Sequence, residues 1–154
     1  MNNKYVINEI LKMGFKYSGV RGIYVLDRIA FKDKFDENGN NDWEKSTGKK
    51  KLQEWAEKNL TKEILKQFDV DIPTVEEVFS HKMLNLYLLR RKLESKQFPL
   101  FMNSDNRMTE FDDIPVCWWT KTAYDGHTYT VWYVVADGGL DYDTVDGTFG
   151  FVPV

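Results

Sequence analysis

Residues 129–145 read YTVWYVVADGGLDYDTV, and this stretch decides the fold of the C-terminal third of the chain. Two sets of side chains alternate through its first half, which is the period of a β-strand with two different faces. One set is Tyr129, Val131, Tyr133 and Val135, and the other is Thr130, Trp132 and Val134. Asp137-Gly138-Gly139 follows as a hairpin signal, because glycine reaches the positive φ angles that tight turns require. The stretch therefore predicts two antiparallel strands, 129–136 and 140–145, joined by a hairpin.

Strand signals continue on both sides of this hairpin. Residues 116–120 and 149–152 are predicted strands, and Asp146-Gly147 is a second hairpin signal. Residues 101–113 have no clear period and are expected to be irregular. The C-terminal third is thus predicted to be a compact antiparallel sheet.

Helical patterns dominate the chain before Pro99. The predicted elements are a helix over 3–13, strands over 15–20 and 23–29, a polar loop over 31–42, a helix near 48–59, a short helix after Thr61, and a helical region over 74–96 with a break at Ser80. The expected N-caps are Ser46 or Thr47, then Thr61, then Thr74 in a capping box with Glu77. Residues 23–26 are nearly all apolar, which indicates a central strand. These patterns predict an α+β fold with helices in the first two-thirds, packed on a small antiparallel sheet formed mainly by the C-terminal third.

Composition indicates one globular domain, since the chain has 154 residues of which 42% are hydrophobic. The single cysteine, Cys117, excludes an internal disulfide and suits a reducing compartment. The sequence has neither a signal-peptide pattern nor an apolar run of membrane-spanning length. We therefore expect a single-domain cytoplasmic protein without a membrane partner, located in the host cytoplasm if a phage encodes it.

The net charge of −3 conceals an asymmetry. Residues 1–103 carry a net charge of +4, whereas residues 104–154 hold nine acidic and two basic side chains, a net charge of −7. The acidic third is either a solvated rim or a surface that selects its partner by charge. The basic cluster Arg90-Arg91-Lys92 stands alone and is interpreted as a solvated helix face, so direct nucleic-acid binding is not favoured.

No motif in the sequence assigns an enzyme, a cofactor or a metal site. Residues 36–42 have the composition of a calcium loop, but Asn41 and Thr47 stand where an EF-hand needs Gly and Glu, so a turn-rich loop is the better interpretation. Cys117 is expected to be buried and inert, and His81 and His127 lie far apart in the sequence. Calcium binding or glycosidase chemistry at the C-terminal aspartates is weaker than the turn interpretation, although calcium binding stays open. These aspartates are Asp137, Asp141, Asp143 and Asp146.

Three groups of short stretches together resemble a known family. The first group is YVLD at 24–27, WEKST at 43–47 and LQEW at 52–55; the second is DIPTVEEV at 71–78; the third is WWTKT at 118–122, VVADGGL at 134–140 and GFVPV at 150–154. Their order and spacing resemble the C-type-lectin-like domains of bacteria and phages, which are distant relatives of formylglycine-generating (sulfatase-modifying) enzymes. The resemblance covers about residues 23–154, so residues 1–22 are expected to be an N-terminal helix and strand extension of one domain. Lys121 and Val152 stand where the family has arginine, so no function tied to those arginines is carried over.

The resemblance implies a rigid sheet that displays loops, and we expect a non-catalytic binding module that uses the loops 120–128 and 137–148. The aromatic side chains divide between core and surface in a way that the sequence does not resolve. The candidate contact residues are Trp118, Trp119, Lys121, Tyr124, Asp125, His127, Trp132, Asp141, Tyr142, Asp143 and Asp146.

The expected partner is a host or phage protein. One alternative is an intracellular inhibitor encoded by a phage or mobile element, whose acidic third imitates nucleic acid in a groove of a host-defence protein. A second alternative is a carbohydrate-binding module that stacks sugars on its Trp and Tyr rings.

Overall fold

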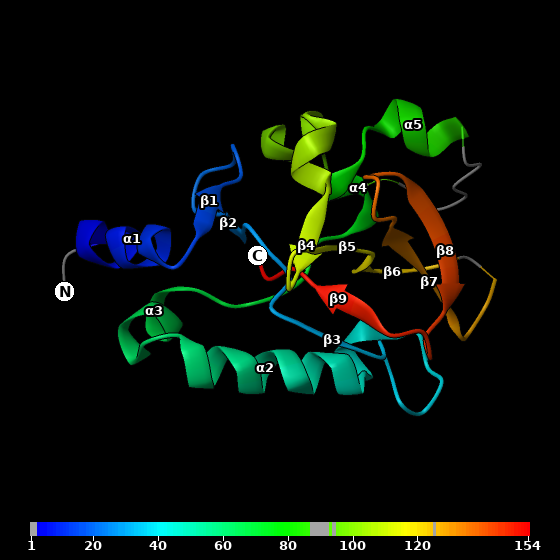
Figure 1. Cartoon of the computed structure of the whole chain (residues 1–154), viewed down its shortest axis with the longest axis horizontal. Helices are drawn as coiled ribbons and strands as arrows, with labels where there is room; N and C mark the ends of the chain where they lie inside the picture. Colours follow the sequence, from blue (N-terminus) through cyan, green and yellow to red (C-terminus); the bar gives the residue numbers. More distant parts are fainter. Residues whose placement is uncertain (1–2, 87–92, 94, 125) are drawn as a thin grey trace.

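The computed structural model describes residues 3–86, 93, 95–124 and 126–154. Helices occupy the first half of the chain and strands lie mostly in the C-terminal part, which confirms the mixed α+β class (Figure 1). The helical elements are α1 (Asn3–Lys12), η1 (Trp43–Lys45), α2 (Thr47–Asn59), α3 (Lys62–Gln67), α4 (Val75–Val78), α5 (His81–Leu86), η2 (Pro99–Met102) and η3 (Ser104–Arg107). The strands are β1 (Phe15–Tyr17), β2 (Tyr24–Leu26), β3 (Phe31–Asp33), β4 (Thr109–Phe111), β5 (Ile114–Val116), β6 (Trp118–Ala123), β7 (Thr130–Val134), β8 (Leu140–Thr144) and β9 (Phe149–Phe151).

Five of the strands form one curled, half-barrel sheet in the order β3-β9-β6-β7-β8. β7 and β8 make the predicted hairpin, in which the N–H of Val135 donates to the carbonyl of Gly139 over 2.8 Å. Neighbouring strands are antiparallel except for β6 and β9, which run parallel where Trp118 pairs with Gly150. The prediction of a purely antiparallel sheet is therefore wrong at this pair.

The second hairpin signal, Asp146-Gly147, does not join two paired strands. β8 lies at the edge of the sheet, whereas β9 lies between β3 and β6. Val145 is buried, and its carbonyl accepts the N–H of Phe35 over 3.0 Å, so the chain leaves the sheet edge at this residue. β9 can then bury Phe151 in the middle of the sheet, because a central strand excludes more apolar surface from water than an edge strand does.

The apolar run at residues 23–26 does not form a central strand of the main sheet. β2 pairs only with β1, in a separate antiparallel ribbon whose register places Phe15 opposite Leu26. Val25 and Leu26 are nevertheless buried, because they pack in the first and third core clusters. The N–H of Leu26 donates to the carbonyl of Pro153 over 2.9 Å, which ties the ribbon to the C-terminal segment. The apolar pattern therefore predicts the burial of this strand correctly but its position in the sheet incorrectly.

Both faces of the main sheet are covered by other elements (Figure 1). On one face Trp118 and Trp132 pack in a cluster with Val78 of α4 and Leu84 of α5. On the other face Trp119 packs in a second cluster that includes Leu52 of α2. A third cluster joins α1, β1 and β2 to α2 and α3.

Local helix signals agree with the structure. Ser46 and Thr61 accept the N-terminal N–H groups of α2 and α3, and Thr74 and Glu77 form the predicted capping box. Only residues 81–86 of the helix predicted over 81–96 form a described helix, and Arg90, Arg91 and Lys92 lie outside the described residues. Among the described residues, no helix combines the length and apolarity needed to cross a membrane.

Candidate functional site

Three of the predicted contact residues lie in the core. Trp118, Trp119 and Trp132 are 1%, 0% and 2% exposed, so they offer no surface to a partner, and their place among the contact residues is corrected. The physical reason is that both faces of the sheet are covered, so both sets of alternating side chains are buried. The ring N–H groups of Trp118 and Trp119 donate to the carbonyls of Arg107 and Asp33 over 2.9 and 3.1 Å.

Other aromatic residues gather at the end of β7 and β8 and form a surface that we call the aromatic patch, namely Tyr124, His127, Tyr129 and Tyr142. Tyr142 lies 4.2 Å from Tyr124 between ring centroids, and both rings pack over Trp132 at 5.4 and 5.2 Å. Tyr129 and Tyr142 are 52% and 46% exposed. Tyr142 rests on the buried Trp132, whereas the ring of Tyr129 contacts that of the exposed His127 at 5.8 Å between centroids. Tyr129, which directly precedes β7, is not among the predicted contact residues.

The loop that carries His127 and Tyr129 is held by a residue from the polar loop far away in sequence. The side-chain amide of Asn41 donates to the carbonyls of His127 and Thr130 over 2.7 and 3.0 Å, and the N–H of Asn41 donates to Thr128 over 2.9 Å. The turn-rich interpretation of that loop is confirmed, because the carboxylate of Asp36 accepts the backbone N–H groups of Asn40 and Thr47. No sequence signal pointed to Asn41 as a positioning residue, because its partners lie more than 80 residues away.

Acidic side chains line the sheet edge beside the aromatic patch, and we call Asp141, Asp143 and Asp146 the acidic edge. Asp141 and Asp143 lie on β8, and each accepts the N–H of the following residue, over 2.8 and 2.7 Å. Asp146 accepts the hydroxyl of Thr144. All three aspartates are exposed, and Asp141 and Asp143 alternate with Tyr142 along the edge strand, so their side chains point to the face opposite to its ring.

Two tyrosines next to the acidic edge have altered acidity. Burial, reinforced by the nearby Asp141 carboxylate, raises the pKa of Tyr133 to about 12. The neighbouring phenol of Tyr124 raises the pKa of Tyr142. Both phenols therefore stay neutral hydrogen-bonding groups near neutral pH.

Lys121 does not join the aromatic patch. The register of β6 against β7 shifts between Trp119 and Ala123, so that four steps along β6 match two along β7. Within this bulge the N–H of Lys121 donates to the carbonyl of Pro73 over 2.9 Å, and its ammonium pairs with Asp71 at 2.6 Å. Asp125, another predicted contact residue, lies outside the described residues.

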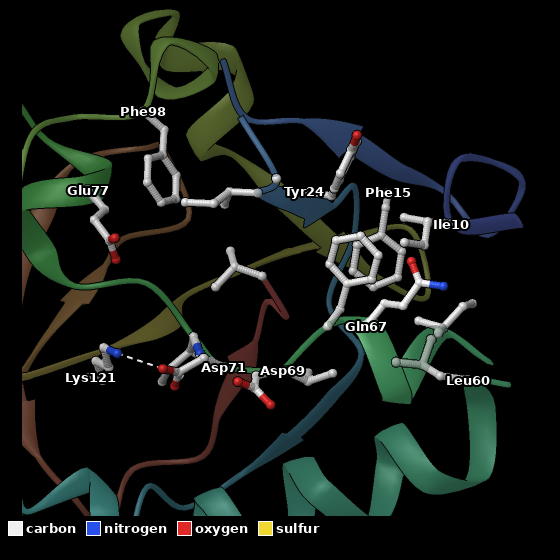
Figure 2. Close-up of a pocket in the computed structure, with 17 residues that line it drawn as sticks. Ile10, Phe15, Tyr24, Leu60, Gln67, Asp69, Asp71, Glu77, Phe98 and Lys121 are labelled. Atoms are coloured by element: carbon white, nitrogen blue, oxygen red, sulfur yellow. Dashed lines mark hydrogen bonds and ion pairs between the residues drawn. The ribbon is translucent and has the colours of Figure 1, made fainter. Parts of the chain in front are cut away.

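Lys121 instead lines a cavity of about 330 Å³ between the N-terminal elements and α3, α4 and β6. Figure 2 shows Lys121, Asp71 and Glu77 at one end of it and Ile10, Phe15 and Leu60 at the other. The segment 1–22, whose role the sequence left open, thus supplies part of one wall through α1 and β1. Sequence patterns did not reveal this cavity, because its walls come from segments that are far apart in the chain.

Candidate catalytic and metal-ligating side chains are dispersed. Across residues 3–86, 93, 95–124 and 126–154, no three His, Cys, Asp or Glu side chains are grouped as metal ligands. Cys117 is half-buried at the junction of β5 and β6, which corrects the expectation of a buried thiol. His81 contacts the carbonyl of Ser95 at 2.6 Å, whereas His127 belongs to the aromatic patch.

Comparison with known proteins places the chain in a family. No curated protein and no solved structure matches it. One family model matches residues 6–154, which include every strand and begin inside the segment that the lectin-like resemblance left out. The chain therefore belongs to the family described as Domain of unknown function (DUF6273).

Proposed function

We propose that this protein is a non-catalytic binding module that contacts a partner protein through the aromatic patch and the acidic edge. The observation that carries the proposal is the exposed ring of Tyr142, held on the buried Trp132, together with the exposed ring of Tyr129 beside His127. Large exposed rings that are already fixed lose little side-chain entropy on binding, and such residues dominate the energy of protein interfaces.

The acidic edge gives the proposed surface its charge. Asp141, Asp143 and Asp146 lie on and just after the strand that carries Tyr142, and none of them forms a salt bridge among the described residues. A surface of one sign attracts partners of the opposite sign and sets the salt dependence of association. The proposed partner therefore presents a basic surface with an apolar recess for the two tyrosine rings.

The proposal includes the C-type-lectin-like relationship expected from the sequence, in which a rigid sheet displays variable loops. The curled sheet, both of whose faces are packed, is consistent with that design. The patch loop 126–129 and the edge strand β8 lie at one end of it, where a binding surface needs rigid support.

A second candidate function is favoured by the acidic edge itself. An intracellular inhibitor from a phage or mobile element could place the three aspartates in the nucleic-acid-binding groove of a host-defence protein, where they would replace phosphate groups. In that version the partner releases the module when salt is raised, because screening weakens contacts between exposed charges.

Affinity capture from the lysate of the native host tests the proposal, with the wild-type protein and two double variants as baits. Tyr129→Ser/Tyr142→Ser removes the exposed rings, and Tyr5→Ser/Tyr17→Ser removes two equally exposed tyrosines elsewhere on the surface. We expect one captured protein that is retained by the control variant and lost with the patch variant. Equal retention by both variants would reject the aromatic patch as the contact surface.

Two further arms separate the versions of the proposal. Washing the complex at low and high salt distinguishes a charge-dominated partner, as the inhibitor version requires, from one that depends mainly on the rings. A glycan array with and without calcium addresses carbohydrate binding. Sugar binding that disappears in the patch variant would replace the protein partner with a glycan.

A further inference from the structure

The cavity beside Lys121 has one end built from the hydrophobic core. Its apolar wall includes Ile10 of α1, Phe15 of β1, and Ile64 of α3, all of which belong to the third core cluster. These side chains are buried and packed on one another, so the wall is fixed before any ligand arrives. Such a wall accepts an apolar group without having to rearrange.

The other end of the cavity is polar, and its charged groups are held in place. The carboxylate of Asp71 accepts the ring N–H of Trp43 over 2.8 Å and the N–H of Ile72 over 2.9 Å, in addition to its pair with Lys121. Glu77 is fixed by its capping bond, in which one carboxylate oxygen accepts the N–H of Thr74 over 2.8 Å.

The charge at this polar end is unbalanced. Three carboxylates line the cavity, those of Asp69, Asp71 and Glu77, against the single ammonium of Lys121. Asp71 already neutralises Lys121 at 2.6 Å, which leaves Glu77 and Asp69 to set the sign of the field. Opposite charges attract and like charges repel over these short distances, so the polar end favours a cation and disfavours an anion.

We propose that this cavity binds a small amphipathic cation, namely an apolar group of aliphatic or aromatic carbon that carries one protonated amine or guanidinium. The apolar body occupies the end beside Ile10 and Phe15, and the cationic head lies near Glu77 and the Asp71–Lys121 pair. A volume of about 330 Å³ lies at the lower end of the range for small-molecule sites, about 300–1,000 Å³, which suits a small ligand. A free amine and a lysine or arginine side chain of a protein segment share this chemistry.

A series of three probes of equal length tests the charge preference on the wild-type protein. Hexylamine, hexanol and hexanoate are titrated separately at neutral pH, and the methyl NMR signals of Ile10 and Ile64 report occupancy of the cavity. We expect hexylamine to bind most tightly and hexanoate most weakly, with about a tenfold difference between them, which corresponds to a modest charge contribution. Equal binding of hexylamine and hexanol, or tighter binding of hexanoate, would overturn the proposal.

Two substitutions are expected to change the affinity for hexylamine in opposite directions. Glu77→Gln keeps an acceptor for Thr74 but removes a negative charge, and it is expected to weaken hexylamine binding roughly fivefold. Lys121→Met removes the cation that competes for Asp71, and it is expected to strengthen hexylamine binding several-fold. Weaker hexylamine binding in Lys121→Met would contradict the assigned charge preference. Lys51→Met, which breaks ion pairs outside the cavity, serves as the control and should leave the affinity unchanged.

A final arm distinguishes the source of the cation. A short capped peptide with one central lysine is compared with hexylamine by the same methyl signals. Binding of the peptide at least as tight as that of hexylamine identifies a protein segment as the occupant, whereas binding of hexylamine alone identifies a free amine. Because Tyr129 and Tyr142 do not line the cavity, the patch variant should bind hexylamine normally, and the two proposals can fail separately.

Discussion

Replacing Thr122 with valine is expected to lower the free energy of unfolding by about 2 kcal/mol, within a range of about 1–3 kcal/mol for a buried group left without its partner. The hydroxyl oxygen of Thr122 accepts the N–H of Val75 over 2.9 Å and thereby anchors the first turn of α4 to β6. Thr122 is 2% exposed and Val75 is 0% exposed, so water cannot replace the lost acceptor. Valine has nearly the shape of threonine, which keeps the packing and isolates the hydrogen bond.

Urea denaturation followed by tryptophan fluorescence measures this change. The midpoint should fall without a change in slope, since the surface exposed on unfolding stays the same. Thr128→Val is the matched control on the exposed patch loop, and it should alter stability by less than about 0.5 kcal/mol. If Thr122→Val proves as stable as the wild-type protein within that margin, the bond between β6 and α4 does not support the polar end of the cavity as described.

Three further predictions concern other parts of the fold. Gly48→Ala should destabilise the protein by about 1–3 kcal/mol in urea denaturation, because the Cβ of alanine would lie 2.5 Å from the carbonyl oxygen of Phe35. Alanine otherwise favours helices over glycine, so a stabilised variant would contradict this steric argument. Tyr133 should titrate with a pKa of about 12 in an ultraviolet phenolate titration, and Asp141→Asn should lower that pKa. Because the pKa of Tyr133 is higher in the folded than in the unfolded state, Tyr133 contributes fully to stability below about pH 10, and this contribution is lost as the pH rises toward 12. The double variant Asp141→Ala/Asp143→Ala frees the backbone N–H groups of Tyr142 and Thr144 on the edge strand β8. It should therefore promote association between edge strands, visible as a larger mass in light scattering. An unchanged mass would show that the edge is protected in another way.

Local features of the fold could be predicted because they depend on neighbours in the sequence. The capping box of Thr74 and Glu77 needs only residues three positions apart, and the β7–β8 hairpin needs only a turn between two strands. Strand order depends on distant partners instead. The sequence predicts a polar loop where β3 lies, yet Phe31 pairs with Phe151 and stacks on it at 4.6 Å between ring centroids. Nothing in residues 31–33 alone indicates this partner.

The candidate site was predictable only in part, for a related reason. Alternation along β6 and β7 assigns Trp118 and Trp119 to opposite faces, but it does not tell whether either face is covered. The residues with free surface, such as Tyr142, lie on the edge strand and in the loops, where packing from other elements ends. Exposure is a property of the whole fold, so the sequence shows that aromatic side chains are abundant but not which of them are exposed.

The bulge in β6 explains why this strand both pairs in the main sheet and lines the cavity. Between Trp119 and Ala123 the strand carries two more residues than β7 can pair, and bulges of this kind turn side chains and backbone away from the regular ladder. The N–H of Lys121 donates to the carbonyl of Pro73, and the hydroxyl of Thr122 accepts the N–H of Val75. These bonds tie α4, which carries Glu77, to β6 at the polar end of the cavity. An uninterrupted strand would have sent these groups into the sheet ladder. The irregularity that sequence periodicity could not locate is therefore the feature that builds the polar end of the cavity.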